Sequence, residues 1–413
     1  MSRHHGAACL EEQSSAPCSS LELSHTAFIN LNAIRALSGM VVVFSHFFQL
    51  YIMPVEGRTY FVNFAISMAE YAVIAFFALS GLLISLSIER NIRRHGCFMW
   101  REYLISRVAR IYPALIASVL LCLILYGVLL LLGLDGAGAL TRPSDVYPAS
   151  RTEFSVSKAE VLLTLMQTYA FGPGGYIAVN GPLWTLSYEV GFYLVAGLLM
   201  TMARGAGIAR LFAAVCLLLV VVVAIKMEKH LFLHYGSIWM LGVGLFFLLK
   251  RRADHVDDAT VTSACGYFSV LCWRTASSTW VGILIFVLLC LSNALLILAK
   301  GEAALIHDYM AALVIIAAMY VLACTRRTMA GHLAKMAGST YTLYLFHFPL
   351  MLFFYALIRD LYDISPVQYF ILASVLTLTI LLTSHYSARL LENRRLWESF
   401  YARLRGGYRE AIS

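Results

Sequence analysis

One stretch near the N-terminus decides the fold of this chain: residues 31–50, which read LNAIRALSGMVVVFSHFFQL. It is apolar enough to lie in lipid, yet it contains Arg35 and His46. Because an ionisable side chain at membrane depth is costly, both are candidate functional residues. The step between them spans about 16 Å and about three whole helical turns, so both side chains lie on one face of one helix. If Arg35 marks the membrane surface, His46 lies close to the middle of a hydrocarbon layer roughly 30 Å thick.

The composition of the whole chain indicates a membrane protein. Of its 413 residues, 60% are hydrophobic and only 13% are charged, whereas a soluble domain is about 25% charged. The sequence therefore predicts an all-α, polytopic helical bundle rather than a soluble enzyme. The nine cysteines are an odd number and lack metal-type spacing, so neither a disulfide framework nor a metal site is expected.

Ten segments are long and apolar enough to cross a bilayer. They are approximately 31–53, 62–88, 110–133, 182–203, 207–226, 231–249, 280–299, 304–324, 340–358 and 366–391.

The distribution of basic residues predicts the orientation of these spans. About three quarters of the 31 Lys and Arg residues fall on the side that holds both termini. Cytoplasmic loops carry the Lys and Arg excess, so both termini should be cytoplasmic and the number of spans should be even. This placement explains the net charge of +8 without nucleic acid, which we exclude as a partner.

Outside the membrane domain, which we place at 31–392, the chain has short tails and one long loop. Residues 1–30 are expected to be a disordered cytoplasmic tail without a cleaved signal peptide, and residues 393–413 a basic cytoplasmic tail. The exterior loop is 134–181. Within it, 157–171 is apolar but too short to span, which predicts a re-entrant or interfacial helix.

Six arginines crowd the 89–110 segment, and Arg107 and Arg110 stand where the third span begins. Residues three apart share a helix face, so these two guanidinium groups point the same way. Because arginine binds phosphate in a planar fork, the pair is a candidate site for a phosphorylated coenzyme. The alternative is that the segment only anchors the chain by the positive-inside rule.

Two further ionisable residues lie inside predicted spans. Glu189 lies roughly 10 Å below the exterior surface, where a carboxylate is paired, protonated or in a water-filled cavity. It either locks helices together through a buried hydrogen bond or orients an imidazole, as a carboxylate does in acyl transfer. His347 is the second intramembrane histidine. It is either a catalytic group or a core histidine that bonds a neighbouring carbonyl.

Several stretches together resemble one known family. LNAIRALSGMVVVFSH (31–46) resembles the motif of an arginine and a histidine separated by ten residues in the acyltransferase 3 family, whose integral-membrane enzymes acylate sugars of exported and cell-surface glycans. FFALSGLLIS, REYLISRVARIYP, PLWTLSYEVGFY and STYTLYLFHFPL are similar to the other landmarks of that family, in its order. The form PLWTLSYE is most similar to members that modify exopolysaccharides.

The resemblance implies an O-acyltransferase that moves an acyl group, most often acetyl, from cytoplasmic acyl-CoA to a glycan hydroxyl. It implies a multi-pass protein of the bacterial inner membrane, with a glycan or lipid-linked oligosaccharide acceptor and with polysaccharide-export machinery as a candidate partner. Arg35, Arg107 and Arg110 would bind the coenzyme phosphates. His46 would be the general base or a transient acyl carrier, tuned by Glu189. Further candidate site residues are His347, Trp184 and Ser187.

A carrier is the rival interpretation. Intramembrane His, Glu and Arg residues also suit a proton-coupled transporter or flippase for a lipid-linked sugar or small anion. The chain lacks two matching halves with helices broken at corresponding places, which disfavours a carrier. Release of free thiol from acyl-CoA distinguishes the two. The acyl group, the acceptor hydroxyl and the side on which transfer occurs stay open at this point.

Overall fold

The computed structural model describes residues 23–134, 156–167, 179–204, 207–226, 230–257, 302–325, 331–358 and 365–393, together with single residues 169, 177, 327 and 328 and most of 395–400. Every regular element within these ranges is a helix. The helices are α1 (His25–Phe47), the π-helix η1 (Phe48–Ile52), α2 (Met53–Glu56), α3 (Tyr60–His95), α4 (Trp100–Leu131), α5 (Lys158–Met166), α6 (Leu183–Arg204), α7 (Gly207–Lys226), α8 (His230–Asp257), α11 (Glu302–Cys324), α12 (Gly331–Met336), the 3₁₀-helix η4 (Ala337–Ser339), α13 (Thr340–Ile358) and α14 (Pro366–Leu391).

The described chain confirms an all-helical membrane protein. Eight helical stretches are long and apolar enough to cross a membrane, and a shorter apolar stretch lies in α7. These nine coincide with nine of the ten predicted spans. The tenth, 280–299, lies outside the described residues, so the full count and the cytoplasmic position of both termini stay predictions.

The first span is one long helix with a change of winding in it. Ser24 caps its N-terminus by accepting a hydrogen bond from the Ala27 amide, so α1 begins six residues before the predicted span. Directly after α1 the chain continues as the π-helix η1 and then α2. Short π-helical segments within helices are frequent at functional sites, and this one begins two residues after His46.

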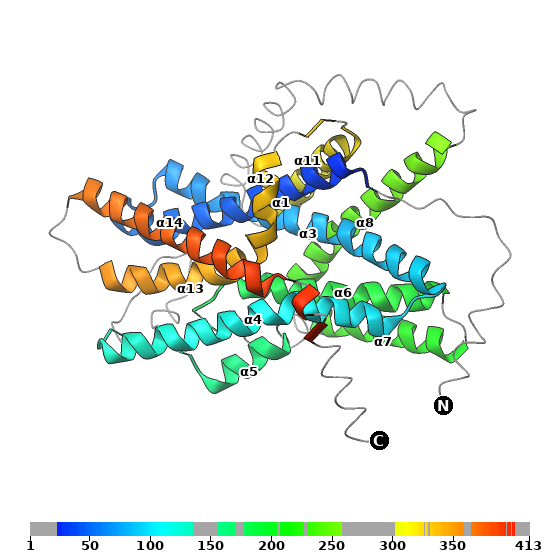
Figure 1. The fold of residues 1–413 in the computed structure, drawn as a ribbon, viewed down its shortest axis with the longest axis horizontal. Coiled ribbons are helices and arrows are strands. Elements are labelled where there is room, and N and C mark those ends of the chain that lie inside the picture. The colour runs from blue at the N-terminus through cyan, green and yellow to red at the C-terminus, as the bar shows by residue number, and fades with distance from the viewer. Residues whose placement is uncertain are drawn as a thin grey trace.

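The centre of the bundle is built around α1, α3 and α13. Most of α13 is buried against α1, α4 and α14, whereas α14 exposes much of its apolar surface, as a helix facing lipid does (Figure 1). In Figure 1, α12 runs across the direction of α13, and the 3₁₀ turn η4 joins the two. The predicted span 340–358 is therefore α13 alone, because the chain changes direction just before Thr340.

Two glycines bring α3 and α8 into backbone contact. A Cβ atom on Gly242 would lie 1.9 Å from the carbonyl oxygen of Ala78, and one on Gly81 would lie 2.1 Å from the carbonyl oxygen of Trp239. No real side chain fits at such distances. Small residues that allow helices to approach this closely are typical of membrane bundles, where packing rather than the hydrophobic effect holds helices together.

Most of the predicted exterior loop lies outside the described residues, but α5 lies within it. Ser157 and Glu160 form a reciprocal capping box at its start, and the chain turns at Gln167 through a left-handed conformation. The helix is nine residues long and packs beside α4, where the Tyr112 hydroxyl donates to the Leu165 carbonyl. A short helix is thus present where 157–171 predicted one, and its interfacial or re-entrant position stays a prediction.

Candidate active site

His46 is held in a defined orientation by Gln49. Its Nδ1–H donates to Gln49 Oε1 at 2.7 Å, which leaves Nε2 as the ring nitrogen with a lone pair. The histidine lines a cavity of about 350 Å³, whose other walls come from α3, α6, α8 and α13. An imidazole with one nitrogen fixed and the other able to accept a proton has the form of a general base.

His347 lies beside His46 in the core. The two ring centroids are 5.3 Å apart, and Phe348 packs edge-on against His46 at 4.9 Å. The His347 Nδ1–H donates to the Leu343 carbonyl at 3.0 Å, while its Nε2 has no hydrogen-bond partner among the described residues. The hydrogen bond to Leu343 is the one expected of a core histidine. The unpartnered Nε2 is a buried acceptor next to the candidate base.

A second cavity, of about 70 Å³, is lined by three of the other predicted site residues. Arg35, Arg110 and Glu189 all line it, from α1, α4 and α6. Glu189 accepts a hydrogen bond from the Tyr193 hydroxyl, and the Ser80 hydroxyl lies 3.5 Å from the same oxygen. Two guanidinium groups and one carboxylate thus line this cavity.

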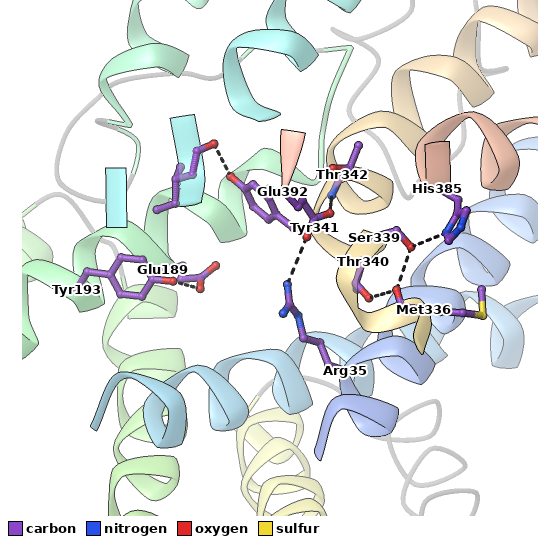
Figure 2. A network of polar contacts seen from close by, with 11 residues as sticks. Arg35, Glu189, Tyr193, Met336, Ser339, Thr340, Tyr341, Thr342, His385 and Glu392 are labelled. Atoms are coloured by element: carbon purple, nitrogen blue, oxygen red, sulfur yellow. Dashed lines mark hydrogen bonds and ion pairs between the residues drawn. The ribbon is translucent and has the colours of Figure 1, made fainter. Parts of the chain in front are cut away.

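Arg35 also pairs with Glu392, which follows the last residue of α14. Figure 2 shows the Arg35 side chain reaching from α1 toward Glu392, with a distance of 4.0 Å between Nη2 and Oε2. The other Glu392 oxygen accepts from the Thr342 amide in the first turn of α13 at 2.8 Å. A carboxylate there satisfies a helix N-terminal amide and fixes the end of α14 against α1 and α13.

Arg107 differs from Arg110 in its surroundings. Its guanidinium donates to Ser87 Oγ at 2.7 Å and Ser106 Oγ at 3.2 Å, and it lies over the rings of Tyr103 and Tyr193. Only 7% of its surface is exposed, so it lies in the helix interface rather than in the Arg35 cavity. The two guanidinium groups therefore do not face one site. Of the pair, only Arg110 lines the cavity together with Arg35.

The two cavities meet at a hydrogen-bonded pair. Val73, Thr185 and Tyr344 line both of them. The Thr185 and Tyr344 hydroxyls are 2.5 Å apart, and the Tyr344 hydroxyl donates to the Pro182 carbonyl at 2.8 Å. A side-chain contact, rather than a layer of backbone, therefore separates the Arg35 cavity from the His46 cavity.

Trp184 and Ser187 occupy different environments on α6. Trp184 lines the His46 cavity, and its ring lies 5.5 Å from that of Tyr235. Ser187 is buried, and its hydroxyl donates to the Gln167 carbonyl at 2.8 Å, which ties the end of α5 to α6. The structure thus associates Trp184 with a ligand cavity and Ser187 with helix packing.

Glu189 lies beside Arg35 and Arg110, not beside His46. It lines the cavity at the level of Arg35, about three turns of α1 from His46, and the partner of His46 is Gln49. Arg35 itself lies about 15 Å along α1 from His25, inside the bundle. The relative depth of α1 and α6 is set by packing, and no pattern within a single span reveals it.

Five residues near the site are not among the predicted site residues. Gln49 follows His46 by three residues, and a polar residue at that spacing within an apolar run is a recognisable signal. Glu70, His307 and Asp308 are ionisable residues inside spans, which is the same signal that singled out His46. Glu392 lies just after the last predicted span, where the sequence favours a surface position, but its side chain is only 14% exposed because it pairs with Arg35.

Comparison with known proteins agrees with this geometry. An O-acetyl transferase of Shigella phage Sf6 is 29% identical over 164 residues, which is 40% of this chain and 43% of the phage protein, so the match spans less than half of that relative. No solved structure matches the chain. The model of the acyltransferase 3 family, described as an acyltransferase domain, matches residues 28–385, which include every residue of the two cavities. The chain belongs to the acyltransferase 3 family.

Proposed function

We propose that the protein moves an acyl group, most simply acetyl, from cytoplasmic acyl-CoA to a hydroxyl of a cell-surface or exported glycan, in a bacterial inner membrane. The observation that supports this most strongly is the pair of adjoining cavities along α1. One is lined by two arginines and the other by an oriented imidazole, and both are lined by Thr185 and Tyr344, whose hydroxyls are in contact. A donor that carries phosphates and an acceptor that must lose a proton fit these two chemistries.

The donor end of the site is assigned to Arg35 and Arg110. Guanidinium groups bind phosphate through paired N–H donors, and two of them on neighbouring helices can flank one pyrophosphate. A cavity of about 70 Å³ has room only for the thioester end of a coenzyme. We therefore expect the helices around this cavity to move apart when the whole coenzyme binds. Arg107 would stabilise α4 through Tyr103 and Tyr193.

The transfer step assigned to His46 is an attack of the acceptor oxygen on the thioester. Nε2 takes the proton of the sugar hydroxyl as its oxygen forms a bond to the acyl carbonyl carbon. The tetrahedral intermediate then breaks its bond to sulfur, and the coenzyme leaves as a thiolate that takes the proton back from the imidazolium. The products are the glycan ester and free coenzyme thiol, with no net proton exchanged with solvent.

His347 can take part in this step as a second hydrogen-bond acceptor. Its unpartnered Nε2 lies in the same buried region, and its tautomer is fixed by the Leu343 carbonyl. A neutral imidazole there can accept a hydrogen bond from the acceptor hydroxyl and hold it near His46. Were His46 instead to carry the acyl group as a covalent intermediate, His347 would be the remaining base for the attacking hydroxyl.

Thermal unfolding with acetyl-CoA tests the donor site. A ligand that binds only the folded protein raises the unfolding midpoint by mass action. At a hundredfold excess over Kd, the free energy of unfolding increases by about 2.7 kcal/mol. We expect acetyl-CoA to stabilise the wild type and to lose this effect in Arg35→Ala/Arg110→Ala. The matched control is Arg94→Ala/Arg101→Ala, which removes two exposed arginines and should keep the shift.

A conservative substitution separates loss of coenzyme binding from loss of folding. Arg110→Lys keeps the charge beside Glu189 but loses the planar fork, so it should fold and show a reduced shift. An unchanged shift in both Arg110 variants would contradict the assignment of the donor site. No shift in the folded wild type at millimolar acetyl-CoA would favour the transporter or flippase instead.

A further inference from the structure

A second group of ionisable side chains is buried between α3, α8 and α11. It consists of Glu70, Tyr71, His234, His307 and Asp308, and the last three are each less than 8% exposed. Charged groups are rarely placed inside a membrane bundle without a function, because their removal from water is costly. Nothing in the transfer step described above uses them.

Asp308 is the centre of this group. Its Oδ2 accepts a hydrogen bond from His234 Nε2 at 2.8 Å, and its Oδ1 lies 3.5 Å from His307 Nδ1. The other nitrogen of His307 lies 2.8 Å from the Tyr71 hydroxyl. The Glu70 and Asp308 carboxyl groups interact directly through their side chains. Two imidazoles and two carboxyl groups thus form one compact network.

The network opens into the His46 cavity through Glu70. Glu70 lines that cavity together with His46, Trp184 and Tyr235. A volume of about 350 Å³ lies within the usual range of small-molecule pockets, roughly 300–1,000 Å³. The cavity that contains the His46 imidazole is therefore also lined by a carboxyl group and two large aromatic rings.

Resting on the proposed function, we propose that Glu70 binds hydroxyl groups of the acceptor sugar in the His46 cavity, and that Asp308, held by His234 and His307, positions Glu70. A sugar ring presents apolar C–H faces and a rim of hydroxyl donors. The rings of Trp184 and Tyr235 offer the apolar surface, and a carboxylate accepts hydrogen bonds from hydroxyls more strongly than a neutral group does. This assignment places the acceptor between Glu70 and His46.

The network is built to hold Glu70 rather than to tie helices together. A purely structural network would satisfy its own polar atoms, because each unpaired buried polar atom is destabilising. Neither Asp308 Oδ1 nor His307 Nδ1 makes a hydrogen bond of regular geometry within the described chain. Asp308 is thus left with acceptor capacity on Oδ1, which a bound hydroxyl can use.

Steady-state kinetics with both substrates test the proposal. The probe is the glycolipid fraction extracted from membranes of cells that encode the chain, titrated against acetyl-CoA while free thiol is measured. We expect Glu70→Gln and Asp308→Asn to raise the half-saturating concentration of the extract at least tenfold, with the KM for acetyl-CoA unchanged. Glu56→Gln, which alters an exposed carboxylate at the end of α2, is the control and should behave as the wild type.

The thermal shift with acetyl-CoA separates the outcomes. Variants that keep the shift and lose only acceptor affinity support the proposal. Variants with wild-type affinity for the extract overturn it, and so do variants that lose the shift and unfold at lower temperature, because these show a structural role alone. A wild type that binds acetyl-CoA but releases no thiol with any extract overturns the proposed function itself.

Discussion

Gln49 is the residue on which the orientation of His46 depends. In hydrolytic triads a carboxylate fixes the tautomer of the base and stabilises the imidazolium that forms. Here an amide oxygen takes the first of these roles without supplying a charge. A neutral orienting group adds no buried charge beside His46, whereas a buried carboxylate there would need its own counter-charge.

Substitution of Gln49 tests this role. Gln49→Met keeps the size of the side chain but removes the acceptor, so kcat should fall about ten- to hundredfold, a part of the 10²–10⁴ that a positioned base contributes. Gln49→Glu restores an acceptor and should recover most of the rate. The KM for acetyl-CoA should be the same in both. Equal kcat in Gln49→Met and the wild type would show that His46 needs no orienting partner.

The sequence was a better guide to individual ionisable residues than to the contacts between them. Arg35 and His46 were expected on one face of one helix, and they border two adjoining cavities. The expected partnership of Glu189 with His46 is not the observed geometry, since Glu189 lies with Arg35 and Arg110. Helical spacing fixes positions within a helix, whereas contacts between helices depend on relative depth and rotation, which one sequence does not encode in a readable form.

The contact between α3 and α8 is the element on which the bundle most visibly depends. These helices place the Glu70 network on one side and Ser80, beside Glu189, on the other. Their backbones touch where Gly81 and Gly242 face the partner helix. A methyl group at either position must push the helices apart.

A pair of glycine variants on α8 tests how strongly stability depends on this close contact between α3 and α8. Gly242→Ala should lower the free energy of unfolding by about 1–3 kcal/mol, the usual effect of overpacking. The reason is that its Cβ would clash with the Ala78 carbonyl oxygen. Gly244→Ala, on the same helix with open space around it, should leave stability unchanged or raise it. Thermal unfolding in detergent compares the two, and equal midpoints would contradict the close contact.

Helix boundaries were predictable where hydropathy determines them. The span 62–88 became the middle of α3, which runs for 36 residues, or about 54 Å, well beyond the hydrocarbon layer. Hydropathy detects only the part of a helix in lipid, so the extension to His95 could not be found that way. The predicted start of the span at 340 matches the start of α13, which directly follows η4.

At the scale of the whole molecule, topology assigns the two cavities to opposite parts of the membrane. The Arg35 cavity lies nearer the start of α1, and the His46 cavity lies nearer its end. If the N-terminus is cytoplasmic, as predicted, the Arg35 cavity is the nearer of the two to the cytoplasm, and the His46 cavity lies deeper in the membrane.

Reporter fusions test that orientation. A fluorescent protein that folds only in the cytoplasm should be fluorescent at either terminus, and alkaline phosphatase, which is active only outside, should be inactive at both. The expectation follows from the Lys and Arg excess on the side of the termini. Phosphatase activity at either end would reverse or break the assigned topology, and with it the access of acyl-CoA to Arg35 and Arg110.

The most direct test of the central claim is acceptor-dependent release of free thiol from acetyl-CoA by the purified protein, measured for the wild type and His46→Ala. The account predicts release by the wild type only when the glycolipid extract is present. It predicts no release by His46→Ala, although that variant should still be stabilised by acetyl-CoA. A folded His46→Ala variant with wild-type turnover would contradict the account.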